Sequence, residues 1–74
     1  MPEPQQIAER ASARMHNDDI ASKNLGITPI SVSPGQAKMS MLVRSDMLNG
    51  HQVCHGGFIF TLADTAFAHA CNSF

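Results

Sequence analysis

The chain has 74 residues with five basic and six acidic side chains, and its formal net charge is -1 at neutral pH. This length allows at most one domain with a small core, and such chains usually need a disulfide, a metal or a partner for stability. The balanced charge excludes the basic surface that nucleic-acid binding requires. The four phenylalanines, without any tyrosine or tryptophan, predict core packing and not base stacking.

Three features predict a cytoplasmic protein without membrane contact. The N-terminus, MPEPQQIAER, is polar and lacks the apolar segment of a signal peptide. Cys54 and Cys71 offer at most one disulfide, as expected in a reducing compartment. The longest apolar stretch, residues 58–74, is shorter than the roughly 20 residues that span a bilayer, and it contains Asp64.

The first half of the chain predicts helical structure followed by a hairpin. Residues 4–24 are expected to form one amphipathic helix that ends at Gly26, because apolar residues recur at four-residue spacing. Residues 27–32 predict a short strand, kinked or at a sheet edge because of Pro29. A turn at residues 33–35 then leads to a half-buried strand over residues 37–43, paired with the first as a hairpin.

The second half predicts an irregular connection and a long apolar helix. Residues 45–55 contain the pair Asn49-Gly50, which favours positive φ. From Gly56 to the end of the chain the pattern has helical period and is apolar nearly all round, as in a central helix wrapped by other structure. Two strands and two helices cannot cover such a helix, so we expect residues 1–74 to be the N-terminal part of a single domain with further strands.

The start of this helix carries the first candidate for chemistry, His55-Gly56-Gly57. Glycine lets a ligand approach the backbone closely, and the first N–H groups of a helix lack internal partners. A carbonyl oxygen placed against them would be polarised toward an oxyanion. The alternative is a glycine-rich helix entry that serves only tight packing.

Asp64 is the second candidate, because an acidic residue in the middle of an apolar helix is costly without a function. The alternative is a structural carboxylate that bonds a backbone turn or a neighbouring chain. Gly56 and Asp64 are eight residues apart, which is about 12 Å along one helix, too far to reach the same carbonyl group. Two copies meeting head to tail across a two-fold axis would combine Gly56 of one with Asp64 of the other.

Two other groups of residues are not expected to carry chemistry. His51, Cys54 and His55 are irregularly spaced and have no second ligand pair, so we expect neither a metal nor a cofactor. His69 is expected to be a packed or edge histidine.

The motifs LNGHQVCHGG (residues 48–57), LADTAFA (62–68) and ACNS (70–73) together resemble the hot-dog-fold thioesterases of the phenylacetic acid degradation type. The resemblance covers nearly the whole chain but only the first half of such a domain. It implies an α+β fold in which an antiparallel sheet wraps a central helix, and assembly into homodimers or homotetramers. It also implies hydrolysis of phenylacetyl-CoA or its ring-hydroxylated relatives to the free acid and CoA.

The resemblance assigns roles residue by residue. Asp64 matches the catalytic acid, acting as nucleophile or as general base, and Gly56 matches the residue whose N–H polarises the thioester carbonyl. His55 and Asn49 match positions that hold the thioester and water. Gly57 and Thr65 are expected to contact the substrate. His69 stands where the family pattern leads us to expect an aromatic residue.

Other functions stay open at this point. A hot-dog hydratase or dehydratase needs an Asp–His pair in one site, and His69 follows Asp64 at an awkward five-residue offset. A non-catalytic acyl-CoA-binding module and an inactive truncated fragment are further alternatives. The acyl group is not specified by these residues.

Overall fold

The N-terminal helical segment is divided at Asp19 into two helices, α1 (Pro4–Asp18) and α2 (Ile20–Leu25), in the computed structural model, which describes residues 2–74. The prediction of one helix over residues 4–24 is therefore wrong at this point. The Asp19 carboxylate accepts hydrogen bonds from the Ser22 backbone N–H at 3.0 Å and from Ser22 Oγ at 2.5 Å. An aspartate in this position satisfies N–H groups that a helix start leaves unpaired, so a new helix begins.

Both ends of this helical segment follow ordinary capping rules. Pro4 is the first residue of α1, and the Glu3 backbone N–H donates to Gln6 Oε1 at 3.1 Å as part of a capping box. At the other end Gly26 has φ +74°, a left-handed conformation that glycine adopts without strain. The prediction that the helical segment ends at Gly26 is confirmed.

A two-stranded antiparallel hairpin follows, as predicted, with β1 (Thr28–Ser33) paired to β2 (Gln36–Ser40). The register shifts between Pro29 and Ser31, a bulge that fits a proline without an N–H for the ladder. Beyond it, Gln5 Nε2 of α1 donates to the Val32 carbonyl oxygen at 2.6 Å. The second strand is shorter than predicted, because residues 41–43 find no pairing partner among residues 2–74.

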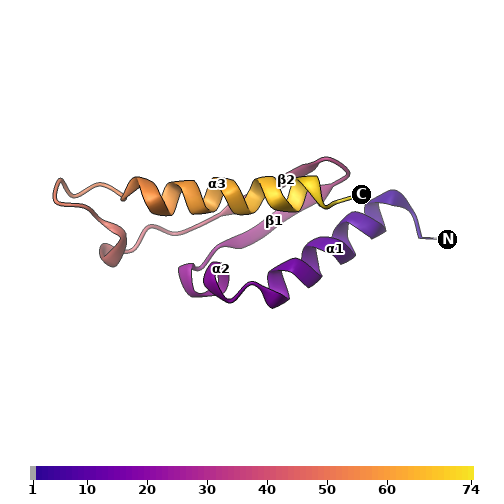
Figure 1. Ribbon diagram of the computed structural model, residues 1–74, viewed down its shortest axis with the longest axis horizontal. Helices are drawn as coiled ribbons and strands as arrows, with labels where there is room; N and C mark the ends of the chain where they lie inside the picture. The colour runs from indigo at the N-terminus through magenta and orange to yellow at the C-terminus, as the bar shows by residue number, and fades with distance from the viewer. Residues whose placement is uncertain (1) are drawn as a thin grey trace.

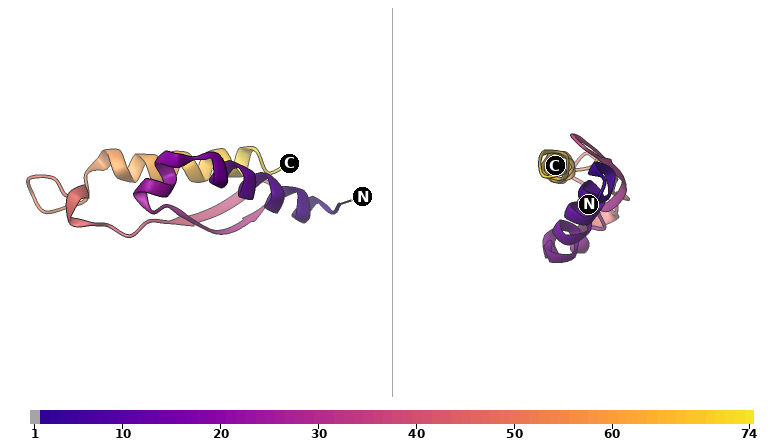
Figure 2. Two further views of the ribbon diagram at one scale, coloured as in Figure 1. Left: turned by 90° about the horizontal axis from the view of Figure 1, so that it is seen from below. Right: turned by 90° about the vertical axis from the view of Figure 1, so that its right-hand side faces the viewer.

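The long helix α3 (Gly56–Cys71) begins where the sequence predicts it and runs along the hairpin (Figure 1). α3 packs mainly against β2, whereas α1 packs against β1. The two views of Figure 2 place α1 and α3 over the same face of the hairpin, with the connection before α3 extending beyond it. The result is an elongated unit of 51 × 19 × 14 Å with one helix end projecting past the hairpin.

The core between these elements is small and partly polar. Its buried apolar side chains are Ala8, Ile27 and Met47, and the buried polar ones are Ser12, Ser22, Thr65, His69 and Ser73. His69 Nδ1 and Ser12 Oγ are 2.7 Å apart in a hydrogen bond between α3 and α1. The prediction of a packed histidine at position 69 is thus confirmed.

One face of α3 is left uncovered by residues 2–74. Ile59, Phe60 and Phe67 are 54%, 70% and 68% exposed. A contiguous apolar surface of this kind marks an interaction surface in a folded protein. Among residues 2–74, the helices are all too short or too polar to cross a membrane.

Candidate active site

His55 caps the N-terminus of α3 with its own imidazole. Its backbone is extended (φ -61°, ψ 134°), and its Nδ1 accepts a hydrogen bond from the Gly57 N–H at 3.2 Å. A ring nitrogen that accepts a hydrogen bond carries no proton, so in neutral His55 the proton lies on Nε2. The ring also meets Phe58 edge to face, with centroids 6.4 Å apart.

The Gly56 N–H is the group that this cap leaves free. Among residues 2–74 it has no hydrogen-bond acceptor, as expected for the first residue of a helix. A Cβ added at Gly56 would meet nothing within 4 Å, so the space on the side-chain side of this residue is open. At the helix start, the structure therefore presents the N–H of Gly56, while that of Gly57 is engaged by His55.

Asn49 organises the loop that leads into α3. Its side-chain Oδ1 accepts from the N–H groups of His51 at 2.8 Å and Val53 at 3.4 Å. Its backbone N–H donates to the Val53 carbonyl at 2.8 Å, and its carbonyl accepts from the Gln52 N–H at 3.1 Å. The positive φ expected near Asn49-Gly50 falls instead on Gln52, at +64°. The side-chain oxygen of Asn49, a predicted site residue, is thus occupied by hydrogen bonds within the loop.

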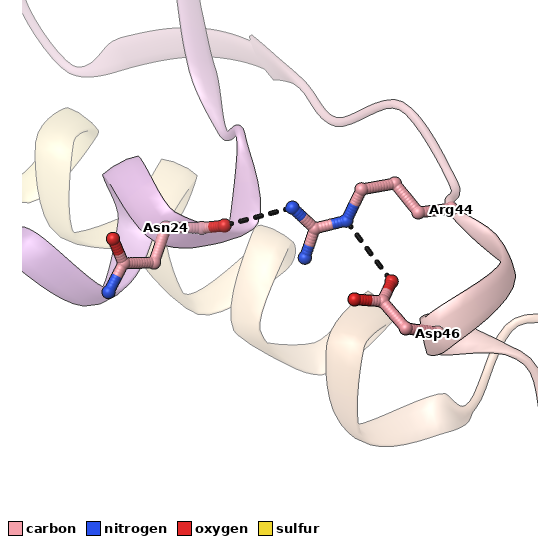
Figure 3. Close-up of polar contacts among 3 residues, drawn as sticks. All are labelled: Asn24, Arg44 and Asp46. Atoms are coloured by element: carbon pink, nitrogen blue, oxygen red, sulfur yellow. Dashed lines mark hydrogen bonds and ion pairs between the residues drawn. The ribbon is translucent and has the colours of Figure 1, made fainter.

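The base of this loop is anchored to the core. The His55 N–H donates to the carbonyl oxygen of buried Met47 at 2.7 Å, and a single bridge joins Leu48 to Cys54. Upstream, Arg44 donates to the Asn24 carbonyl oxygen at 3.1 Å and pairs with Asp46 at 3.1 Å (Figure 3). These contacts link the segment before α3 to α2 and to the core.

Asp64 lies on the uncovered face of α3 and is exposed in this chain. The expectation that its carboxylate is buried is therefore not met by residues 2–74, because none of their elements covers this face. Phe60 precedes Asp64 by four residues and Phe67 follows it by three, so all three side chains share one side of the helix. Asp64 is thus a lone carboxylate on an exposed apolar surface.

This chain does not bring Asp64 and Gly56 together. Both lie on the unbroken helix α3, where eight residues correspond to about 12 Å along the axis. One thioester carbonyl cannot contact both groups of the same copy.

Thr65 points to the packed side of α3. It is buried, its Oγ1 donates to the Thr61 carbonyl oxygen at 2.8 Å, and it lies 3.5 Å from Ser22 Oγ of α2. Successive helical residues diverge by about 100°, which separates its side chain from that of Asp64. The hydroxyl of Thr65 therefore serves the contact between α3 and α2 in this structure.

The remaining polar residues form no second centre. Within residues 2–74 no three His, Cys, Asp or Glu side chains gather as metal ligands, and Cys54 and Cys71 are free thiols. A cleft of about 600 Å³ lies between α1 and β1, lined in part by Ser12, His16 and Ile30, and it includes none of the predicted site residues.

Sequence reasoning missed how much of the site is built by local hydrogen bonds. The cap at His55 was not expected, because helix N-caps are usually Ser, Thr, Asp or Asn. The role of Asn49 in closing a turn could have been inferred, since asparagine side chains often bond to the backbone two residues on.

Comparison with known proteins agrees with this architecture. The chain is 58% identical to the acyl-coenzyme A thioesterase PaaI of Escherichia coli over 59 residues, which cover 80% of this chain and 42% of that protein. It is 43% identical to a protein of Archaeoglobus fulgidus named "Putative esterase", over 92% of this chain and 44% of that protein. No family model matches the chain.

A solved structure matches in fold as well. The E. coli PaaI protein from the phenylacetic acid degradation operon superimposes with a TM-score of 0.94 and 49% sequence identity, over 96% of this chain and 51% of that one. The chain therefore spans about half the length of the relatives it matches. Over that length, both sequence and fold confirm the resemblance to hot-dog-fold thioesterases of the phenylacetic acid degradation type.

Proposed function

We propose that the protein containing this chain is an acyl-CoA thioesterase that hydrolyses phenylacetyl-CoA or hydroxyphenylacetyl-CoA to the free acid and CoA. The observation that carries the proposal is a pair of groups on α3 that have no partner among residues 2–74: the amide N–H of Gly56 and the carboxylate of Asp64. The relatives named as a thioesterase and an esterase support the same reaction class.

Gly56 is suited to stabilise the oxyanion. Its N–H lies at the positive end of the α3 dipole and has no acceptor among residues 2–74. A thioester oxygen that accepts this hydrogen bond gains more stabilisation as negative charge develops on it in the transition state. The His55 cap supports this role, because it engages Gly57 and leaves Gly56 as the free donor.

Asp64 supplies the reacting carboxylate. As a general base it takes a proton from a water molecule that attacks the acyl carbon, and collapse of the tetrahedral intermediate expels the CoA thiolate, which is then protonated. As a nucleophile it attacks the same carbon and expels the CoA thiolate, which is then protonated, and water hydrolyses the resulting acyl–aspartyl anhydride to the free acid and the aspartate. Both routes need the same carboxylate beside the same carbonyl.

The separation of the two groups along α3 favours a site shared between copies. The uncovered apolar face around Phe60 and Phe67 is the kind of surface that a second copy and further strands would cover. A homodimer with antiparallel α3 helices would create two equivalent sites, each using Gly56 of one copy and Asp64 of the other. Such dimers could pair into tetramers, and burial would then strengthen the electrostatics at Asp64.

We further propose that residues 1–74 form the N-terminal part of one hot-dog domain. The unpaired segment of residues 41–43 and the uncovered face of α3 both support additional strands beside β2. Those strands would contribute contacts to CoA and to the acyl group.

Paired substitutions at Gly56 and Asp64 in the full-length protein test the mechanism. Asp64→Asn is expected to lower kcat for phenylacetyl-CoA by at least about 10³-fold, while substrate binding is largely kept. Gly56→Pro removes the N–H and puts the proline ring in its place, at a helix position that tolerates proline, and is expected to lower kcat by about 10²-fold or more. Gly56→Ala is the comparison variant, because it adds a Cβ but keeps the N–H, and an equal loss of kcat in both variants would show that the missing N–H is not the cause.

Mixed oligomers test whether the site is shared between copies. A heterodimer of one Asp64→Asn copy and one Gly56→Pro copy would retain one intact site if the two groups come from different copies. It would retain none if they come from the same copy. Recovery of about half the wild-type rate per dimer supports the shared site, and the absence of recovery refutes it.

The same assays separate the alternative functions. A folded oligomer that binds acyl-CoA without releasing CoA would indicate a binding module. A monomer that unfolds without cooperativity and has no turnover would indicate an inactive fragment. Near-normal kcat in Asp64→Asn would remove this carboxylate from the mechanism.

A further inference from the structure

We propose that Asn49 is a positioning residue, whose side-chain oxygen fixes the loop of residues 49–53 and thereby sets the place of the Gly56 N–H. This inference rests on the proposed function and adds to it a residue that acts through the backbone. It differs from the expectation that Asn49 holds the thioester and water directly.

The first line of evidence is how completely the loop is closed around Asn49. Oδ1 accepts from the N–H groups of His51 and Val53, while the backbone of Asn49 bonds to Val53 and Gln52. Four hydrogen bonds therefore converge on one residue in a segment that is otherwise exposed. A side-chain oxygen used in this way replaces backbone bonds that the turn cannot make internally.

The second line of evidence is the backbone at Gln52. Its φ of +64° is unfavourable for a residue with a Cβ and costs roughly 1–3 kcal/mol. Such a conformation persists only where neighbouring contacts hold it, and the Gln52 N–H donates to the Asn49 carbonyl at 3.1 Å. The bonds to Asn49 are the contacts that hold the loop in this shape.

The third line of evidence connects the loop to the site. Leu48 before the loop and Cys54 after it form a bridge, and the His55 N–H donates to the carbonyl oxygen of buried Met47 at 2.7 Å. His55 in turn caps α3, and Gly56 is the first residue of that helix. Closing the loop at Asn49 therefore fixes Cys54 and His55, which set the position of the Gly56 amide.

Three substitutions at position 49 in the full-length protein separate positioning from direct contact. Asn49→Ala removes the acceptor. Asn49→Ser restores an acceptor without charge, and Asn49→Asp restores one without an amide donor. Amide hydrogen exchange at His51 and Val53 reports on the loop, and kcat and KM for phenylacetyl-CoA report on the site.

If Asn49 positions the loop, Asn49→Ala speeds exchange at both amides and lowers kcat on the order of 10²-fold, the cost of a misplaced catalytic group. Asn49→Ser and Asn49→Asp then recover both the slow exchange and most of the lost kcat. Unchanged exchange in Asn49→Ala would overturn the proposal. The proposal would also be overturned if Asn49→Ser and Asn49→Asp both restored slow exchange but not kcat. The side-chain NH₂ of Asn49, which both variants lack, would then act on the substrate directly.

The exchange measurement also keeps this inference separate from the proposed function. A wild-type protein that does not hydrolyse acyl-CoA would count against the thioesterase, and with it against any role of Asn49 in that reaction. Faster exchange in Asn49→Ala would still show that its oxygen holds the loop.

Discussion

Ser12 and His69 lie 57 residues apart in the sequence and are joined by a buried hydrogen bond of 2.7 Å between Oγ and Nδ1. This bond ties the N-terminal helix α1 to the helix that carries the candidate site. It is also the polar centre of an otherwise small core, in which Ser22 and Thr65 make a neighbouring contact.

Removing this bond is expected to loosen α1 from α3. Ser12→Ala leaves a buried ring nitrogen without its partner, which costs about 1–3 kcal/mol of the free energy of unfolding. Chemical denaturation of the full-length protein measures the loss, with Ala13→Ser on the exposed side of α1 as a control of similar size. Equal stability of Ser12→Ala and wild type would contradict the role of the bond.

Stability is expected to fall as the pH is lowered through the range of histidine titration. Burial lowers the pKa of His69 below its ordinary value of 6.5, nearby His16 lowers it further, and Asp19 opposes them. The unfolded chain therefore binds a proton at a pH where folded His69 does not, so the free energy of unfolding decreases below about pH 6.5.

His69→Gln tests this pH dependence directly, because glutamine can hydrogen-bond Ser12 but does not titrate. Thermal midpoints measured between neutral and mildly acidic pH should decline less steeply in this variant than in wild type. An identical decline would assign the acid sensitivity to other groups.

Asp19 is expected to stabilise α2 as its N-cap. Asp19→Ala should lower the free energy of unfolding by about 0.5–2 kcal/mol, since the Ser22 N–H and hydroxyl lose their acceptor. These bonds also lower the pKa of Asp19 below 3.8, so its contribution is present above that pH and is lost as the pH falls further. Asp18→Ala, at an exposed neighbour, should have a smaller effect.

The cap at His55 can be separated from any contact with substrate. His55→Asn keeps an N-cap acceptor and should stay close to wild type in stability, whereas His55→Ala should lose about 1 kcal/mol. Denaturation curves measure the cap, and turnover of phenylacetyl-CoA measures the site. Equal stability of the two variants would show that the bond from Gly57 contributes nothing.

Replacing Gln52 with glycine is expected to stabilise the protein. Glycine adopts the positive φ found there without strain, so Gln52→Gly is expected to raise the free energy of unfolding by up to about 1 kcal/mol. Gly50→Ala is the matched control in the same loop, because Gly50 does not have a positive φ and its added Cβ would meet no atom within 4 Å. A loss of stability in Gln52→Gly would contradict this account of the loop.

Much of the fold could be predicted from the sequence because its signals are local. The end at Gly26, the hairpin turn and the start of α3 each depend on glycine conformations or on a change of hydrophobic period. The four-residue spacing of Ile7, Ala11 and Met15 stops at Asp19. The break there was missed because its signal is a single carboxylate, which acts by capping the next helix.

The candidate site was predicted less completely, for a different physical reason. The free N–H of Gly56 follows from its place at a helix start, but the exposure of Asp64 depends on which elements cover α3. The burial of Thr65 depends on α2 packing against one side of that helix, and periodicity does not specify a packing partner. Hydrophobic periodicity therefore could not predict these features, because they depend on contacts between residues that are distant in the sequence.

The bulge at Pro29 has a consequence for how the sheet can grow. Along the outer side of β1 the proline offers no donor, and the Val32 carbonyl is already taken by Gln5. A strand from a neighbouring molecule would find this edge a poor template, whereas β2 keeps an open side. Within residues 2–74 the two edges of the hairpin therefore differ, and a strand that joins it is expected to pair with β2 and not with β1.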